Sequence, residues 1–281
     1  MNDHDVTING INIHYVTWNS GSKSDRPPVL LVHGLTSSSR AWMKLGDFLA
    51  AKGWFVIAPD LRGRGLSEKP PHGYGVVFHV NDLLSLCDSL GLSKVIFFGH
   101  SLGAAIGLYF CGLFPTRIEK FVLVDAGIRL PQDTVQAIGA SLNRLGQVYP
   151  SIESYLALCK QIPFHKWDSF WEEYYRYDAD VRKDGTVTSR VPKSVIQEEI
   201  AANSIINTEL LAPLVKVPTL LVRATLGTLG ADRGLLLPRE EAERLRGIMQ
   251  NSEIVEIPDT NHYTIIISEN FQREVSNFIG K

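Results

Sequence analysis

Short apolar runs alternate along the chain with amphipathic stretches of helical periodicity, and this alternation most constrains the fold. The runs lack polar residues at every second position, so strands built from them must be buried on both faces. Such strands occur in a parallel sheet that helices cover on both sides. The predicted strands are residues 29–32, 54–58, 95–98, 121–124, 219–222 and 254–257. The predicted helices are residues 41–52, 77–90, 102–114, 239–250 and 269–279. Before them, Asn9-Gly10 within residues 6–18 predicts a β-hairpin.

The alternation stops once, between Ile128 and Ala212. This stretch has no apolar strand, is helical in character and is rich in aromatic residues, including Trp167 and Trp171. We predict a core domain of residues 1–127 and 213–281, with residues 128–212 inserted as a helical cap. Many aromatics in one segment suggest that some line an apolar pocket. Because they also stand at helical contact spacing, the alternative is that they only pack the cap together.

Composition and charge exclude several classes of function. The net charge is −2, without a basic stripe, so we expect no nucleic-acid partner. No apolar run approaches the roughly 20 residues of a membrane span, and the acidic N-terminus does not resemble a secretory signal. The three cysteines lack CxxC spacing, which favours buried thiols in a reducing cytoplasm. Nothing in the sequence indicates an oligomeric state.

The turn at residues 99–103 is the strongest chemical motif. Gly99-His100-Ser101-Leu102-Gly103 follows a predicted buried strand, and a predicted helix opens at once. In this G-x-S-x-G context the turn lifts the serine hydroxyl above the sheet, with glycines where side chains would clash. The helix N-terminus places main-chain N–H groups beside the hydroxyl. We therefore predict that Ser101 is a nucleophile.

Four segments together resemble the α/β-hydrolase family over nearly the whole chain. They are His33-Gly34-Leu35, residues 60–67, residues 99–103 and Asn261-His262. The resemblance implies a mostly parallel eight-stranded sheet with helices on both faces and a helical cap after the sixth strand, where residues 128–212 fall. Within the family the chain looks like capped hydrolases that act on small esters, lactones or carbon–carbon bonds. Residues 62–65 could be interpreted as a phosphate cradle, but a structural turn is favoured.

His262 is the predicted base among the eight histidines. It follows the last predicted strand, and the carboxyl ends of parallel strands are where ligands meet such sheets. The order serine first, histidine last also matches this fold. His100 adjoins Ser101 but is expected to point elsewhere, and His165 in the cap is the outside candidate. An oxyanion would need two N–H donors, one from Leu102 after the nucleophile and the other, as the resemblance implies, from Leu35.

The acid that orients His262 has three candidates. Asp125 ends the strand at 121–124, at the same sheet edge as Ser101, where a carboxylate is rigidly held. Asp232 follows the strand at 219–222, where most of the family keeps its acid, but the intervening loop is long and lacks the usual acidic cluster. Asp259 lies in a turn that favours hydrogen bonds to its own backbone. We favour Asp125 over Asp232 and keep both as candidates.

These observations predict a carboxylesterase-type serine hydrolase with a catalytic triad and no metal or organic cofactor. Its substrate would be a small, partly apolar ester or lactone, cleaved through an acyl-enzyme. Epoxide hydrolases and dehalogenases of this fold use an aspartate nucleophile, and Ser101 argues against both. Carbon–carbon bond hydrolysis and perhydrolysis stay open because they also use serine. A small-ligand receptor on the same fold is the alternative from another class.

Overall fold

The computed structural model describes residues 1–21, 26–162, 165–205 and 207–281. In this part of the chain an eight-stranded sheet has the order β1-β2-β4-β3-β5-β6-β9-β10. The strands are β1 (Asn2–Ile8), β2 (Ile11–Trp18), β3 (Val29–Val32), β4 (Val56–Pro59), β5 (Val95–His100), β6 (Ile118–Val124), β9 (Thr219–Ala224) and β10 (Ser252–Ile257). β2 pairs antiparallel with β1 and with β4, and all other pairs are parallel. The predicted fold class is confirmed.

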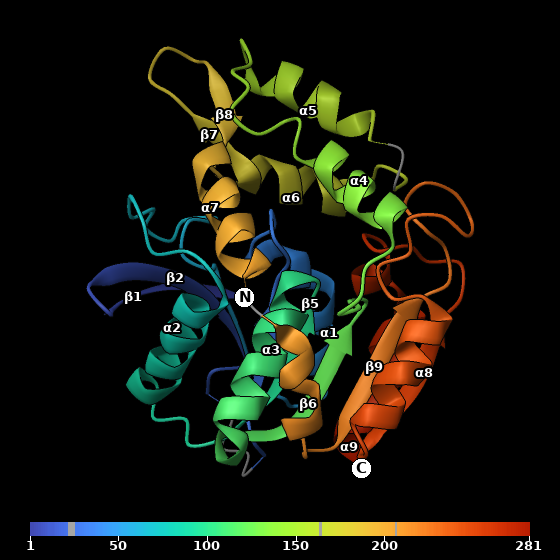
Figure 1. Cartoon of the computed structure of the whole chain (residues 1–281). Helices are drawn as coiled ribbons and strands as arrows, with labels where there is room; N and C mark the ends of the chain where they lie inside the picture. The colour runs from blue at the N-terminus through green and yellow to red at the C-terminus, as the bar shows by residue number, and fades with distance from the viewer. Residues whose placement is uncertain (22–25, 163–164, 206) are drawn as a thin grey trace.

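Helices cover both faces of this sheet (Figure 1). α2, α3 and α8 pack on one face, and α1 and α9 on the other. The helices are α1 (Met43–Ala51), α2 (Val76–Ser89), α3 (Leu102–Leu113), α8 (Arg239–Ile248) and α9 (Glu269–Gly280). Short 3-10 turns are η1 (Ser39–Trp42), η2 (Pro115–Arg117), η3 (Thr208–Leu210), η4 (Ala212–Leu214) and η5 (Ile265–Ile267). None of the described helices is both long and apolar enough to cross a membrane.

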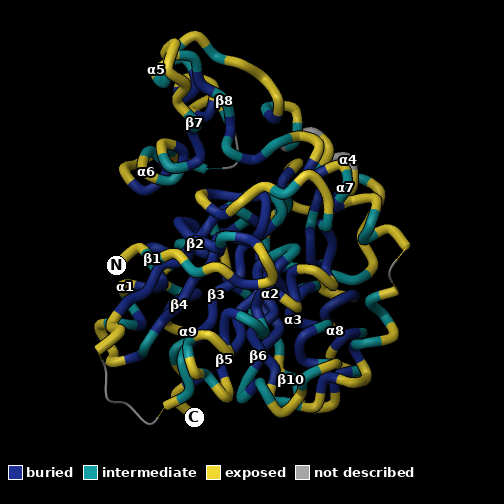
Figure 2. Tube along the Cα trace, turned by 90° about the vertical axis from the view of Figure 1, so that its left-hand side faces the viewer, coloured by how far each residue is buried: buried dark blue, intermediate teal, exposed yellow. Residues whose placement is uncertain are grey.

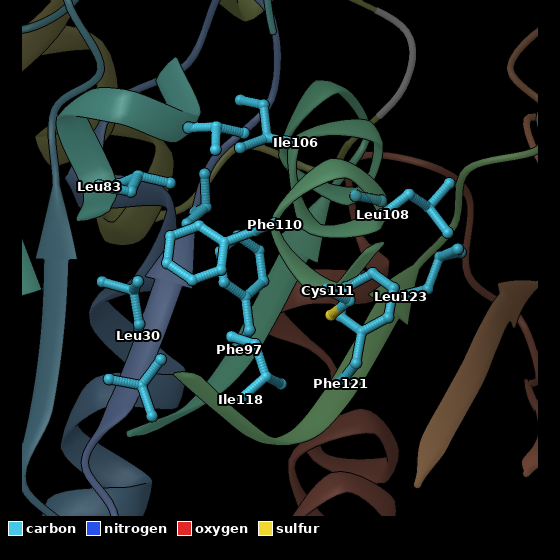
Figure 3. Packing of buried hydrophobic residues seen from close by; sticks show 14 of the residues in the cluster. Leu30, Leu83, Phe97, Ile106, Leu108, Phe110, Cys111, Ile118, Phe121 and Leu123 are labelled. Atoms are coloured by element: carbon cyan, nitrogen blue, oxygen red, sulfur yellow. The ribbon is translucent and has the colours of Figure 1, made fainter. Parts of the chain in front are cut away.

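The central strands are buried on both faces, which explains why their sequences do not alternate. Neighbours such as Phe97 and Phe98 are each fully buried, yet they belong to two hydrophobic clusters on opposite sides of the sheet. Figure 3 shows the first cluster, in which Phe97 and Phe121 of the sheet meet Phe110 of α3. Burying a side chain of this size contributes about 1.5–3 kcal/mol. The sheet and its helices are therefore a rigid base for residues at the strand ends.

The predicted hairpin is also present. Asn9 and Gly10 connect β1 to β2 with φ angles of 50° and 76°. Two positive φ angles define the tight turn that matches the twist of a hairpin, and Asn-Gly adopts it at low cost.

Residues 128–212, which we call the insertion, lie between β6 and β9. They form α4 (Gln132–Ser141), α5 (Ile152–Lys160), α6 (Ser169–Asp178), β7 (Ala179–Val181), β8 (Val187–Ser189) and α7 (Lys193–Ser204), followed by η3 and the start of η4. Figure 2 shows α5, α6, β7 and β8 above the buried centre of the sheet. A helical cap was predicted here, but the insertion also contains two short strands: β7 and β8 pair antiparallel around a turn with Gly185 at φ 84°. Asp184-Gly185 is a hairpin signal that the sequence analysis missed.

Candidate active site

Ser101 is the single residue between β5 and α3. In Figure 1 the insertion lies above the end of the sheet to which the arrowheads of β6 and β9 point. The φ and ψ angles of Ser101 are 56° and −119°, a conformation that costs a non-glycine residue about 1–3 kcal/mol. The flanking backbone is tightly packed. A Cβ atom on Gly99 would lie 2.2 Å from the Gly103 carbonyl oxygen, and one on Gly103 would lie 2.2 Å from that of Val32. The two glycines therefore permit the strained turn that presents the serine.

His262 and Asp125 form a buried pair beside this turn. Nδ1 of His262 donates to Oδ2 of Asp125 at 2.9 Å, with side chains 9% and 2% exposed. The other Asp125 oxygen accepts the N–H of Ala224 at 2.9 Å, so the carboxylate is fixed from both sides. Asp125 follows β6 directly, and His262 lies in the loop after β10. With Nδ1 as the donor, Nε2 of the neutral ring is left as an acceptor.

The other two candidate acids lie elsewhere. Asp232 is exposed and borders a surface depression together with Asp133 and Arg223. Asp259 is exposed in a turn, with φ 57°, and its N–H donates to Thr225. Of the three aspartates, the structure places Asp125 against His262.

His100 contributes to the site in a way that the sequence did not indicate. It was expected to point elsewhere, but it lines the same pocket as Ser101 and His262. Its Nε2 donates to the His262 carbonyl oxygen at 2.9 Å, and the two ring centroids are 4.4 Å apart. Burial and the neighbouring His262 hold the pKa of His100 well below the ordinary value for histidine. His100 is therefore a neutral side chain that holds the His262 backbone, and no local motif signals this long-range contact.

Ser101 and His262 open onto one small pocket of about 80 Å³ between the sheet and the insertion. Its walls are mostly apolar, with a few hydroxyl groups. The lining residues are Gly34, Leu35, Thr36, Ser37, His100, Ser101, Ile138, Trp171, Tyr174, Thr228, Leu236, His262, Tyr263 and Ile266.

The two tryptophans predicted to line the pocket differ in position. Trp171 is buried and lines it. Trp167 is not among the lining residues of this pocket within the described chain, so its role in the pocket stays a prediction. Its ring stacks on Tyr175, with centroids 5.7 Å apart, so it packs within the insertion. His165, the outside candidate for the base, stacks on Trp171 with centroids 4.1 Å apart and is likewise not a lining residue of this pocket.

The two predicted oxyanion donors flank Ser101. Leu102 begins α3, so its N–H precedes the hydrogen-bonding ladder of the helix. Leu35 follows β3 and lines the pocket, and its neighbour Gly34 is so close to Ser101 that an added Cβ would lie 3.1 Å from the serine Cβ. Among the described residues, neither N–H donates to a main-chain acceptor in a turn or loop, so both stay predicted oxyanion donors.

The arginine side chains in the turn at residues 62–65 bind other parts of the protein and do not form an open phosphate site. Arg62 donates two hydrogen bonds to Asp82, at 2.6 and 2.7 Å. Arg64 is fully buried and donates to the carbonyl oxygens of Leu35 and Arg62 and to Glu199. Both guanidinium groups are occupied by protein acceptors, which favours the predicted structural turn.

Comparison with known proteins places these features in a family. One curated relative is epoxide hydrolase 2 of Siraitia grosvenorii, 38% identical over 119 residues, which are 42% of this chain and 36% of the relative. Another is 2-(acetamidomethylene)succinate hydrolase of Mesorhizobium japonicum, 31% identical over 150 residues, which are 52% of this chain and 54% of the relative. The matches thus span only about a third to a half of the length of these relatives.

Solved structures match over the whole chain. The crystal structure of E-2-(acetamidomethylene)succinate hydrolase has a TM-score of 0.87 and 21% identity, covering 99% of both chains. The enol-lactonase of Burkholderia xenovorans has a TM-score of 0.74 and 21% identity, covering 99% of this chain and all of the other. At these identities the likeness shows the fold alone. The sequence model described as the alpha/beta hydrolase fold matches residues 27–268. The chain therefore belongs to the α/β-hydrolase fold family.

Proposed function

We propose that this protein is a serine hydrolase that cleaves a small, partly apolar carboxylic ester or lactone through an acyl-enzyme. One observation carries the proposal. Ser101, on its strained turn, lines the same pocket as His262, whose Nδ1 donates to the buried Asp125 carboxylate. This is the arrangement of a nucleophile, a base and the group that orients the base.

The proposed reaction begins when the Ser101 hydroxyl attacks the acyl carbonyl carbon and Nε2 of His262 takes the hydroxyl proton. Asp125 keeps the proton of the imidazole on Nδ1 and stabilises the imidazolium that forms. His262 then gives its proton to the leaving alkoxide, which departs as the alcohol. Water, deprotonated by His262, then attacks the acyl-enzyme carbonyl carbon. The bond to the Ser101 oxygen breaks, that oxygen takes the proton back from His262, and the acid is released.

Negative charge develops on the carbonyl oxygen in each tetrahedral intermediate. The Leu35 and Leu102 N–H groups are proposed to bind this oxygen. Main-chain donors fixed in a water-poor site need little reorganisation during the reaction, and the loss of one such donor costs about 10²–10³-fold in rate. The neighbouring helix N-terminus of α3 adds a favourable dipole.

The pocket favours a small, uncharged acyl group. The pocket volume of about 80 Å³ is well below the roughly 300–1,000 Å³ of pockets that hold drug-sized ligands, so a small acyl group is favoured. Leu236, Ile266 and Trp171 supply apolar wall, and the lining residues within the described chain include no lysine or arginine.

The nucleophile position separates this chain from its epoxide hydrolase relatives. Enzymes of that activity on this fold attack with an aspartate, whereas this chain has Ser101. A serine at this point supports acyl transfer. Carbon–carbon bond hydrolysis and perhydrolysis use the same three residues and are tested with the same variants.

The test combines turnover with covalent labelling. We expect a series of p-nitrophenyl esters from acetate to octanoate to be hydrolysed, with the short esters preferred. A fluorophosphonate should label one serine, which peptide mass spectrometry should assign to Ser101, and prior labelling should abolish hydrolysis. Labelling elsewhere with activity retained would refute the assignment. Tight retention of ligand with negligible turnover of every ester would instead support the receptor.

Trp171 is expected to set the acyl preference. Trp171→Ala removes a wall of the pocket, so the ratio of kcat/KM for hexanoate to that for acetate should rise at least about tenfold, as one methylene is worth about 10- to 200-fold in such pockets. Trp167→Ala is the matched control because Trp167 packs outside the pocket. It should leave this ratio within about twofold while lowering thermal stability. Equal changes of the ratio in both variants would contradict the assignment.

A further inference from the structure

Each residue of the loop 35–37 accepts a hydrogen bond from a longer side chain. Two of these side chains belong to the insertion, and the third belongs to the core but is bound by a residue of the insertion. Tyr174 of α6 donates its hydroxyl to Oγ of Ser37 at 3.0 Å, and Arg144 donates Nη2 to the Thr36 carbonyl oxygen at 3.3 Å. The third contact comes from the core, where Nε of Arg64 donates to the Leu35 carbonyl oxygen at 3.0 Å. This loop contains one of the two proposed oxyanion donors.

Arg64 is in turn anchored by Glu199 of α7. Its Nη2 lies 2.9 Å from Oε2 of Glu199, and both side chains are 0% exposed. Glu199 also binds His79 at 2.7 Å and accepts from Asn203 at 2.9 Å, so each carboxylate oxygen is occupied. A buried arginine that lost this carboxylate would keep an uncompensated charge, which is strongly unfavourable.

Hydrogen bonds to the carbonyl oxygens of Gly34 and Leu35 fix the direction of the Leu35 N–H. This group belongs to the peptide between Gly34 and Leu35, whose carbonyl accepts from Nδ1 of His33 at 2.8 Å. The next peptide, beyond the Leu35 Cα, is held by Arg64 through its carbonyl. With the peptide planes on both sides of Leu35 fixed, its backbone dihedral angles have little freedom.

We infer that Glu199 is a positioning residue: through Arg64 it sets the Leu35 N–H in place, so the docking of α7 on the core completes the oxyanion site. The inference rests on the proposed serine hydrolase function. A misplacement of about 1 Å in a catalytic geometry can cost 10²-fold in rate. The insertion thus acts on the chemical step as well as on the shape of the pocket.

Consecutive glutamates on α7 provide a matched pair for the test. Glu198 also joins the insertion to the core, but its Oε1 accepts the N–H groups of Gly73 and Tyr74, at 2.8 and 3.2 Å, in a different loop. Glu199→Ala removes the anchor of Arg64, and Glu199→Gln keeps its reach and one acceptor oxygen. Glu198→Ala breaks a contact between the same two parts of the molecule without touching Arg64.

The kinetic result should separate these variants. For a short p-nitrophenyl ester, we expect kcat to fall about 100-fold in Glu199→Ala and about tenfold in Glu199→Gln, with KM within about threefold. Glu198→Ala should keep kcat within about twofold. Circular dichroism and thermal melting check that each variant folds. If Glu199→Ala does not fold, the kcat of Glu199→Gln tests the inference.

A transition-state analogue gives a readout that a merely structural role would not change. A short alkyl boronic acid forms a tetrahedral adduct with Ser101, and one of its oxygens occupies the oxyanion site. Its affinity should fall in the Glu199 variants by the same factor as kcat/KM, whereas the affinity of the product acid should stay unchanged. Full kcat in a folded Glu199 variant, or an equal loss in Glu198→Ala, would overturn the inference. Activity retained without Ser101 would instead overturn the proposed function beneath it.

Discussion

Replacing Ser101 by alanine is expected to lower kcat for ester hydrolysis by about 10³-fold or more, because the variant has no hydroxyl to form the acyl-enzyme. The remaining rate would come from substrate binding and from the Leu35 and Leu102 donors. Initial rates with a short p-nitrophenyl ester, measured on enzyme purified to remove contaminating esterases, provide the test.

The fold of this variant should be unaffected. Ser101 is only partly buried, and alanine removes one oxygen atom without changing the strained backbone. The free energy of unfolding should therefore stay within about 0.5 kcal/mol of the parent protein. A folded Ser101→Ala variant with parental activity would eliminate the serine mechanism. Loss of activity together with loss of the fold would have to be resolved with Ser101→Cys or Ser101→Thr.

The second large effect is expected at Asp125. Asp125→Asn should lower kcat by about 10⁴-fold, because the carboxamide does not fix the imidazole in the tautomer that leaves Nε2 as the acceptor, and it does not stabilise the imidazolium. KM should change little, since Asp125 is buried behind His262 and is not a lining residue of the pocket. Steady-state kinetics of the folded variant measure both constants.

Asp232→Asn is the control with the same chemical change. Asp232 is exposed at a surface depression bordered by Arg223, so its amide variant should keep kcat within about twofold. The reverse result, a crippled Asp232→Asn beside an active Asp125→Asn, would mean that the loop after β9 supplies the acid during turnover.

Much of the fold could be predicted because its signals are local. Leu30 and Leu31, like Phe97 and Phe98, are successive apolar residues that face opposite clusters, and only a sheet covered on both sides gives both of them a buried environment. The Asn9-Gly10 turn was predicted for the same reason. The short β7–β8 hairpin was missed because its strands have only three residues each, too few for a periodic pattern.

The candidate site was predictable where a residue is tied to the end of a strand. Ser101, Asp125 and His262 each follow a strand that the apolar pattern located. Other parts depend on contacts between distant segments. Arg64 and Glu199 are 135 residues apart, and His100 and His262 are 162 residues apart. Trp167 and Trp171 are four residues apart in the same aromatic segment, so the sequence does not distinguish them. Only the packing of the insertion decides that Trp171 lines the pocket while Trp167 stacks on Tyr175.

The crowded backbone around the serine turn also bears on how this scaffold diversifies. Gly99 and Gly103 are enclosed by main-chain atoms, so any side chain at either position would push α3 away from the strands. The side chain at position 101, by contrast, points into the pocket space. New chemistry can therefore arise there by exchanging one nucleophile for another, whereas a side chain at position 99 or 103 would displace the backbone that presents the nucleophile.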